Sequence, residues 1–267
     1  MSEAIYTEVT RGWPSEDRER FRPGHFTHLA KTGSTNDDLL SRARAGDSVP
    51  FELISADYQS SGRGRRGDRW VAASGRNLLF SLALPLDGPR ETWSRLPQLT
   101  ASLVGRAIED ILGPAHRLEA KWPNDLLYKE QKLAGILVEI SLLPSPVAIV
   151  GVGINVNLRR DELPADLRDL ATSLYEITEC ESSRWFLLGL ILRGFLKHYP
   201  DGISDFSAAL AWVTARDLLH GRNLRVRSGH EWLAGTASGI GSGGELLLTT
   251  ESGVAREIVS AEEILWK

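Results

Sequence analysis

Residues 60–70, SSGRGRRGDRW, place four arginines among three glycines and end on a tryptophan. Arginine is always charged and binds carboxylate or phosphate through paired hydrogen bonds. Glycine lets the backbone approach a ligand closely. The loop therefore fits a site for small anions, with Trp70 placed to cover a flat ring. A solvated loop and a nucleic-acid contact are the alternatives that these residues leave open.

The glycines of this loop also match the spacing of dinucleotide-binding loops, as do those of GIGSGG at 239–244. That motif works only when a helix begins directly after it, because the helix N-terminus binds the pyrophosphate. Residues 68–76 have no helical pattern, and residues 245–249 have the pattern of a strand. The sequence also lacks the GxxxxGK[ST] motif of P-loop proteins. Neither nucleotide-binding fold is predicted.

A second group of charged side chains lies in KWPNDLLYKEQKLAGILVE, residues 121–139. A hairpin at the turn YKEQ would bring Lys121 and Lys132 to one end of a sheet. Two adjacent ammonium groups repel unless an anion lies between them. A hydrated hairpin surface explains either lysine alone, and Asn124-Asp125 after a proline is also an ordinary turn signal.

Two shorter motifs offer polar groups and room for close approach. In GVGINVN (151–157), Gly151 and Gly153 lie on one face of a predicted strand, where glycine is unfavourable unless another group must come close. A flat ligand explains both glycines, and so does a bulge or tight packing. STN at 34–36 is a candidate helix cap, and its hydroxyl and amide groups also suit a small polar ring.

The hydrophobic pattern predicts the elements that position these motifs. Strands are expected at residues 25–30, 51–58 and 77–85 and repeatedly between 116 and 158, with short turns that favour antiparallel pairing. Helices are expected at 35–46, 93–113, 167–177, 182–200 and 203–216. From about residue 220, short alternating strands between glycine-rich turns are typical of a small β-barrel.

We therefore expect an α+β fold with three parts. Residues 25–219 form a catalytic domain with a mixed, largely antiparallel sheet flanked by helices, and residues 220–267 form the barrel. Residues 1–24 are polar and charged, and we interpret them as a poorly ordered arm or a short added element.

The composition limits the class of protein. The 267 residues carry a formal net charge of −4, which argues against a general nucleic-acid binder. A single cysteine, Cys180, excludes a disulfide framework and a multi-thiolate zinc site, and no residue is assigned to a metal. The N-terminus lacks the apolar segment of an export signal. We expect a cytoplasmic protein without a membrane partner.

Five segments occur in the order and approximate spacing of the biotin–protein ligases, which the chain resembles over roughly residues 25–267. They are STN (34–36), YQSSGRGRRGDRW (58–70), KWPND (121–125), KLAGILVE (132–139) and GVGINVN (151–157). The resemblance implies a mixed sheet flanked by helices and a terminal barrel. It also implies an enzyme that makes biotinyl-5′-adenylate from biotin and ATP and passes biotin to a lysine of an acceptor protein.

Carried over by position, the resemblance implies roles for individual residues. It implies catalytic roles for Lys132 and Arg63, which hold the biotin carboxylate and the phosphate, and places Asp125 beside Lys132. We add the hypothesis that Asp125 is catalytic and orients or deprotonates the acceptor amine. The implied biotin site is Ser34, Thr35, Asn36, Gln59, Gly62, Arg63, Gly64, Arg65, Lys132, Gly135, Leu137, Gly151 and Gly153. The implied ATP and adenylate site is Arg65, Arg66, Trp70, Lys121, Asn124 and Asn155.

The resemblance also implies the substrates and the partner. These are biotin, ATP with Mg²⁺, and a biotin carrier protein or domain such as that of an acetyl-CoA carboxylase. Nothing before residue 25 has the pattern of a DNA-binding domain, so no operator binding is expected, while a monomer and a homodimer both fit. Asp68 stands where relatives often have a basic residue, and its effect stays open. The alternatives are a lipoate–protein ligase of the same fold and a non-catalytic RNA-binding module.

Overall fold

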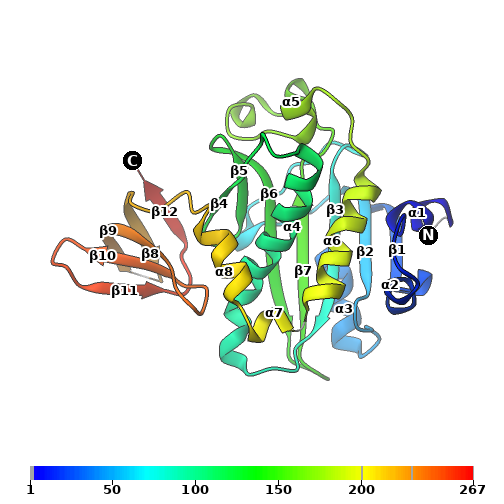
Figure 1. Cartoon of the computed structure of the whole chain (residues 1–267), viewed down its shortest axis with the longest axis horizontal. Coiled ribbons are helices and arrows are strands. Elements are labelled where there is room, and N and C mark those ends of the chain that lie inside the picture. Colours follow the sequence, from blue (N-terminus) through cyan, green and yellow to red (C-terminus); the bar gives the residue numbers. More distant parts are fainter. Residues whose placement is uncertain (1–2, 200, 230, 267) are drawn as a thin grey trace.

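The computed structural model describes residues 3–199, 201–229 and 231–266, apart from the side chain of Arg66. Its centre is a seven-stranded sheet in the order β1-β2-β3-β7-β6-β5-β4 (Figure 1). Only β1 and β2 pair in parallel, which confirms the predicted mixed, largely antiparallel sheet. The strands are β1 (Phe26–Thr32), β2 (Leu53–Gln59), β3 (Leu78–Pro85), β4 (Glu119–Lys121), β5 (Asp125–Tyr128), β6 (Gln131–Ser141) and β7 (Val147–Ile154).

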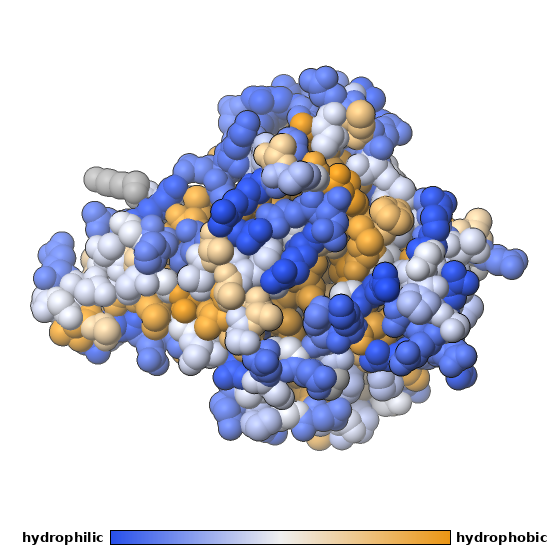
Figure 2. Space-filling model, in the orientation of Figure 1, coloured by the Kyte–Doolittle hydropathy of each residue, from blue (hydrophilic) through white to orange (hydrophobic). Residues whose placement is uncertain are grey.

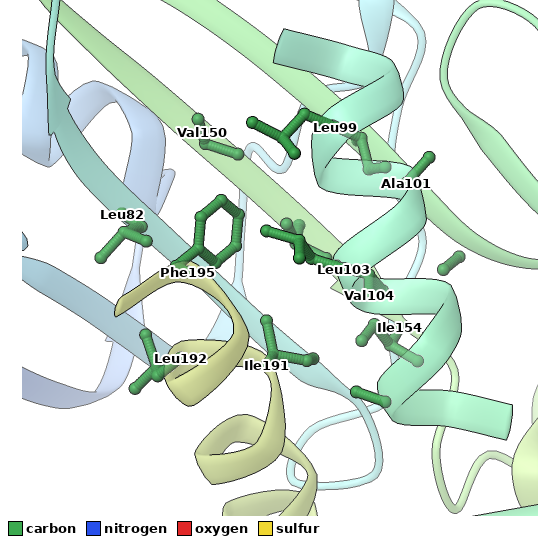
Figure 3. Close-up of a cluster of buried hydrophobic side chains, with 14 of the residues drawn as sticks. Leu82, Leu99, Ala101, Leu103, Val104, Val150, Ile154, Ile191, Leu192 and Phe195 are labelled. Atoms are coloured by element: carbon green, nitrogen blue, oxygen red, sulfur yellow. The ribbon is translucent and has the colours of Figure 1, made fainter. Parts of the chain in front are cut away.

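Helices α4 (Leu96–Leu112) and α6 (Arg184–His198) cover one face of this sheet (Figure 1). Their apolar residues join alternate residues of the strands in the largest hydrophobic core of the described chain. Figure 3 shows Phe195 of α6 and Leu103 of α4 in this cluster, together with Val150 of β7. This core gives the sheet a rigid backing, so its other face is free to carry a site.

Helix α3 (Thr35–Ala45) packs on the opposite face of the sheet. Its Leu39 and Leu40 form a smaller core with Ala83 of β3 and Ile149 of β7. The residues directly next to Ala83 and Ile149 along their strands belong to the core on the first face. The alternation follows from the period of two along a strand. The helix ends at Gly46, whose φ of 80° is the left-handed conformation that glycine adopts easily. The predicted helix and its end are confirmed.

One predicted helix is two helices in the structure. Residues 203–216 contain the end of α7 (Asp201–Ser204) and all of α8 (Ser207–Thr214). The Asp205 carboxylate accepts hydrogen bonds from the backbone N–H and the hydroxyl of Ser207, at 3.2 and 2.6 Å. Such a local side-chain contact competes with the helical backbone ladder and starts a new helix. The predicted short helix at 167–177 is reduced to α5 (Leu174–Thr178) after 3-10 turns.

The residues before β1 form two short helices, α1 (Glu3–Val9) and α2 (Ser15–Arg20). The side chains of Val9 and Phe21 are each 1% exposed. Gly189 of α6 faces the carbonyl group of Val9 so closely that a Cβ there would collide with it. These packed helices favour the interpretation as a short added element over that as a poorly ordered arm.

The C-terminal part is a five-stranded antiparallel sheet in the order β11-β10-β9-β8-β12. Its strands are β8 (Asn223–Ser228), β9 (Glu231–Ile240), β10 (Leu246–Thr250), β11 (Ala255–Ile258) and β12 (Glu263–Trp266). The strands of the predicted barrel are present, but among the described residues no pairing of β11 with β12 closes the ladder. Trp122 belongs to the core of this sheet and donates a hydrogen bond to the Gly244 carbonyl at 2.9 Å. It thereby joins the two parts.

The surface has mixed character. Figure 2 shows hydrophilic residues spread over the face that carries α4 and α6, with hydrophobic residues visible between them. Within the described residues, no helix has both the length and the apolar character needed to cross a membrane.

Candidate active site

The floor of the candidate site lies on β6 and β7, on the sheet face that carries α3. Gly135 pairs directly with Gly153, and Leu137 pairs with Gly151. Because side chains alternate between the two faces of a strand, the residues between them enter the core under α4. The floor is therefore a strip of backbone that flat groups can approach closely, and in this structure Asn36 and the Trp70 indole lie against it.

A pocket of about 230 Å³ lies over this floor. It brings together sixteen of the predicted site residues, which come from α3, the arginine loop and β2, β4, β5, β6 and β7. These are Ser34, Thr35, Asn36, Gln59, Arg63, Gly64, Arg65, Trp70, Lys121, Asn124, Asp125, Lys132, Gly135, Leu137, Gly151 and Gly153. Gly62 and Asn155 do not line the pocket, and the side chain of Arg66 lies outside the described part of the chain.

The arginine loop is a closed hairpin beside the pocket. The backbone N–H of Trp70 donates to the carbonyl of Gly62 at 3.0 Å, and that of Gly64 donates to the carbonyl of Asp68 at 2.6 Å. This folding turns the Trp70 indole onto the glycine strip. A Cβ on Gly153 would lie 2.6 Å from Cε2 of Trp70, and one on Gly135 would lie 2.9 Å from its Cζ3. Trp70 itself thus explains two of the floor glycines.

Hydroxyl and amide groups at the start of α3 form a connected cluster. Thr35 donates its backbone N–H to Oε1 of Gln59 at 2.8 Å, and its hydroxyl lies 2.7 Å from that of Ser81. The Ser81 hydroxyl donates in turn to Oδ1 of Asn36 at 2.5 Å. Ser34 is the N-cap residue of α3, but its side chain makes no capping hydrogen bond. These groups are buried and fixed in orientation, which suits recognition of a small polar ring.

Arg63 is held by two carboxylates. Its guanidinium contacts Asp37 and lies 3.2 Å from Oε2 of Glu139, which also accepts a hydrogen bond from Asn36 at 2.8 Å. Partial burial alone would lower the pKa of Arg63, but the Glu139 and Asp37 carboxylates raise it above its ordinary value. Arg63 is a permanent cation here, and its two partners leave the group with an excess of negative charge.

Lys132 and Lys121 lie in the same pocket, as the predicted hairpin requires. The ammonium of Lys132 is 2.8 Å from the Asp125 carboxylate. The ammonium of Lys121 lies 4.0 Å from the ring centre of Trp266 in β12. Burial lowers the pKa of Lys121; Asp125 opposes that shift and the charge of Lys132 adds to it. Arg63 and Lys132 thus line one pocket, but each is paired with a different carboxylate.

The C-terminal sheet completes the wall of the pocket. Residues 261–264, which lead into and form β12, are among its lining residues. Arg65 of the arginine loop donates a hydrogen bond to the Ala261 carbonyl at 3.4 Å. The site therefore includes a segment about 200 residues away from the loop in sequence.

Asn155 has a structural position behind Lys132. Its side-chain amide donates to the Thr172 carbonyl at 3.0 Å and reaches the Lys132 carbonyl at 3.5 Å. Both backbone groups of Lys132 also form hydrogen bonds, its N–H to residue 170 and its carbonyl to residue 172. Asn155 therefore fixes the strand that presents Lys132, and the nucleotide contact that the resemblance implies stays a prediction.

Several residues at the site were not predicted from the sequence. The segment 261–264 lines the pocket, and Asp37, Ser81 and Glu139 lie behind the lining, where they contact Arg63 or Asn36. Ser81 has a local signal, because it is the one polar side chain within the apolar strand LLFSLALP. Glu139 follows Leu137 at the two-residue period of the pocket face, so the strand pattern also indicates it. The C-terminal segment has no such local signal.

The segment of the chain that carries the pocket motifs matches a known protein family. The model of the biotin/lipoate A/B protein ligase family matches residues 31–157, which carry all five motifs. Among solved structures, the biotin protein ligase of Aquifex aeolicus in complex with biotin and ATP has a TM-score of 0.77 to this chain. The two are 30% identical, and the match covers 91% of this chain and 99% of that one.

Curated relatives agree with this match. The biotin–[acetyl-CoA-carboxylase] ligase of Mycobacterium tuberculosis is 31% identical over 89% of this chain and 87% of its own length. That of Paracoccus denitrificans is 32% identical over 89% of this chain and 99% of its length. The bifunctional ligase/repressor BirA of Bacillus subtilis is 35% identical, and the chain spans 65% of its length. The chain belongs to the biotin–protein ligase family.

Proposed function

We propose that this protein is an ATP-dependent ligase that activates biotin as biotinyl-5′-adenylate and transfers it to a lysine of a carrier protein. One observation carries the proposal: Arg65 of the arginine loop, Lys121 of β4 and Lys132 of β6 line one pocket together with Ser34, Thr35 and Asn36 of the hydroxyl and amide cluster. The pocket can therefore fix a polar ring and neutralise acids in one place. The activities named for the relatives from M. tuberculosis and P. denitrificans support the same reaction.

The first step joins two anions. A carboxylate oxygen of biotin attacks the α-phosphorus of ATP, and pyrophosphate leaves. Two unit charges 4 Å apart repel by about 4 kcal/mol at an effective dielectric constant of 20. Arg65 and Lys132 supply fixed positive charge around the reacting oxygens. Arg63 contributes once it exchanges one of its two carboxylate partners for the substrate.

Mg²⁺ would enter the site with ATP. The described residues contain no group of three or more His, Cys, Asp and Glu side chains that could hold a metal ion. Asp125, which lines the pocket, and Asp37 and Glu139, which contact Arg63 beside it, already face lysine or arginine. The residues present therefore fit an ion held by phosphate oxygens, as Mg²⁺ commonly is at nucleotide sites. There it adds positive charge to that of the lysines.

In the second step the acceptor lysine attacks the carbonyl carbon of the adenylate, AMP leaves, and the attacking nitrogen loses a proton. Asp125 lines the pocket 2.8 Å from the ammonium of Lys132. Its carboxylate is placed to orient the amine or accept the proton. The closed loop and Trp70 limit the access of water, which would otherwise hydrolyse the mixed anhydride.

The proposed acceptor is a biotin carrier domain, such as that of an acetyl-CoA carboxylase. Repression at an operator is not part of the proposal, because α1 and α2 pack against α6 and do not form a separate helical domain. A cytoplasmic location and a monomeric or homodimeric state remain predictions from the sequence.

Labelled biotin and labelled lipoate, each offered with ATP and the carrier domain of an acetyl-CoA carboxylase, test the substrate. We expect incorporation of biotin and none of lipoate, because the buried amides and hydroxyls around Asn36 suit a ureido ring. Incorporation of lipoate in preference to biotin would replace this proposal by its family alternative. The RNA-binding module is not favoured, given the family to which the chain belongs.

A further inference from the structure

The outer face of the C-terminal sheet carries an exposed tryptophan between two arginines. Trp232 of β9 is 41% exposed, and the guanidinium carbons of Arg225 and Arg227 on β8 lie 5.0 and 5.9 Å from its ring centre. Leu265 of β12 is 45% exposed and pairs with Arg225. We refer to these four residues as the outer patch.

The outer patch is not needed to build the core of the sheet. Along β8 the alternate residues Leu224 and Val226 are buried in that core, whereas Arg225 points to the other face. Among the described residues, Arg225 has no carboxylate partner within ion-pair distance, and only Glu263 offsets Arg227, at 3.5 Å. A cationic patch around an exposed tryptophan remains, and tryptophan and arginine are the residue types that dominate binding energy at protein interfaces.

The outer patch is continuous with the rim of the active site. Glu263, the partner of Arg227, is also one of the residues that line the pocket. Figure 1 shows β12 on the side of the C-terminal sheet that is nearest to β4. Neighbouring strands are about 4.8 Å apart, so Trp232, two strands from β12, lies about 10 Å from this rim across the sheet.

An acceptor protein must cover this surface when its lysine enters the pocket. A specific interface buries about 800 Å² on each partner, which is a disc with a radius of about 16 Å. We infer that the outer patch is a docking surface for the acceptor, and that the acceptor presents acidic and apolar side chains beside its target lysine. The inference rests on the proposed function and adds to it a contact that serves only the transfer step.

The two half-reactions separate this contact from catalysis. Biotin-dependent ATP–pyrophosphate exchange needs no acceptor, whereas transfer to the carrier domain of an acetyl-CoA carboxylase does. The variants are Trp232→Ala, Trp232→Phe and Arg225→Glu. The matched control is Arg256→Glu, which reverses an exposed charge on β11 at the far edge of the same sheet. Thermal unfolding of each variant reports on the sheet itself.

We expect Trp232→Ala and Arg225→Glu to lower kcat/KM for the acceptor by about tenfold or more, through KM. Pyrophosphate exchange and the unfolding temperature should stay unchanged, Trp232→Phe should recover part of the loss, and Arg256→Glu should have no effect. Salt should raise KM of the wild type more than that of Arg225→Glu.

Three results would overturn the inference. Unchanged transfer in both variants would remove the docking role, and so would an equal loss in Arg256→Glu. Parallel loss of exchange and transfer would mean that the patch serves the structure. Failure of the wild type to exchange pyrophosphate would instead refute the proposed function.

Discussion

Gly153 and Trp70 set the shape of the pocket floor at the level of single residues. The indole lies where a side chain at position 153 would be, and its ring nitrogen is buried without a hydrogen-bond partner among the described residues. A buried donor of this kind costs stability unless a ligand or water completes it. A ligand group or a water that accepts a hydrogen bond from this N–H would remove that cost.

We predict that Gly153→Ala weakens biotin binding by about tenfold or more. Its Cβ would come within 2.6 Å of Trp70, and overpacking of this size costs about 1–3 kcal/mol unless the indole moves away. Calorimetric titration with biotin and urea unfolding measure the two effects. Gly24→Ala is the control, because a Cβ there meets nothing within 4 Å. Biotin affinity equal to that of the wild type would show that the strip is not part of the site.

Lys121 gives a prediction about pH. Burial lowers its pKa, so between that pKa and the ordinary value of 10.5 the unfolded chain binds more protons than the folded one. The free energy of unfolding therefore gains a component that rises with pH in this window. Lys121→Met should lack that component, so the stability of the wild type should rise relative to the variant as pH increases toward about 10.

Urea unfolding at a series of alkaline pH values checks this result. Lys197→Met, on the exposed side of α6, is the control and should run parallel to the wild type. Parallel curves for Lys121→Met as well would mean that position 121 is not desolvated.

The sequence predicted the cations that line the pocket better than the contacts that hold them. Arg63 stands in a loop whose composition fits an anion site as well as a solvated loop, and the resemblance is what assigns Arg63 and Lys132 to a site. Glu139, a partner of Arg63, looks like an ordinary surface carboxylate until the strands pair, and the pairing of Lys132 with the predicted site residue Asp125 was equally hidden. An ion pair depends on the fold, so residue types at a distance in sequence do not reveal it.

At the level of elements, the position of Lys132 depends on the segment that follows β7. The N–H of Lys132 donates to the Leu170 carbonyl at 2.8 Å, and its carbonyl accepts from Thr172 at 3.0 Å. Asn155 holds the same segment through the Thr172 carbonyl. This segment is irregular, yet it fixes the start of β6 as a neighbouring strand would.

Asn155→Ala should therefore lower both stability and the rate of adenylation. A buried carbonyl that loses its donor costs about 1–3 kcal/mol, and Lys132 loses its fixed position. Urea unfolding measures the first effect and kcat for pyrophosphate exchange the second. Asn223→Ala, at an exposed position of β8, serves as the control. A loss of ATP affinity with unchanged stability would instead point to the direct nucleotide contact implied by the resemblance.

The regular elements of the sheet were predictable because their apolar residues repeat at the periods of strands and helices. The predictions of secondary structure failed at segments whose conformation depends on contacts that the apolar pattern does not show. Val9 and Phe21 are too widely spaced to give α1 and α2 a clear pattern, yet both are buried. Asp205 breaks the last predicted helix through a contact that is easily taken for a surface charge.

At the level of the whole molecule, the active site is shared between the sheet and the C-terminal part. Trp122 fills the core of the C-terminal sheet and lies next to the pocket residues Lys121 and Asn124 in the chain. Residues 261–264 close the wall from the other side. Motif analysis missed this because the contact of Arg65 with Ala261 joins positions 196 residues apart. The resemblance identified the family, but the contribution of residues 261–264 to the pocket wall could be seen only in the folded structure.

The most direct test is ATP–pyrophosphate exchange by the wild type, Lys132→Ala and the control Lys197→Ala, each with and without biotin. The central claim is that cations gathered in one pocket hold the carboxylate of biotin against the α-phosphate. The wild type and Lys197→Ala should exchange pyrophosphate only when biotin is present, and Lys132→Ala should be slower by about 100-fold or more. Exchange that does not require biotin, or that proceeds at the wild-type rate in Lys132→Ala, would contradict it.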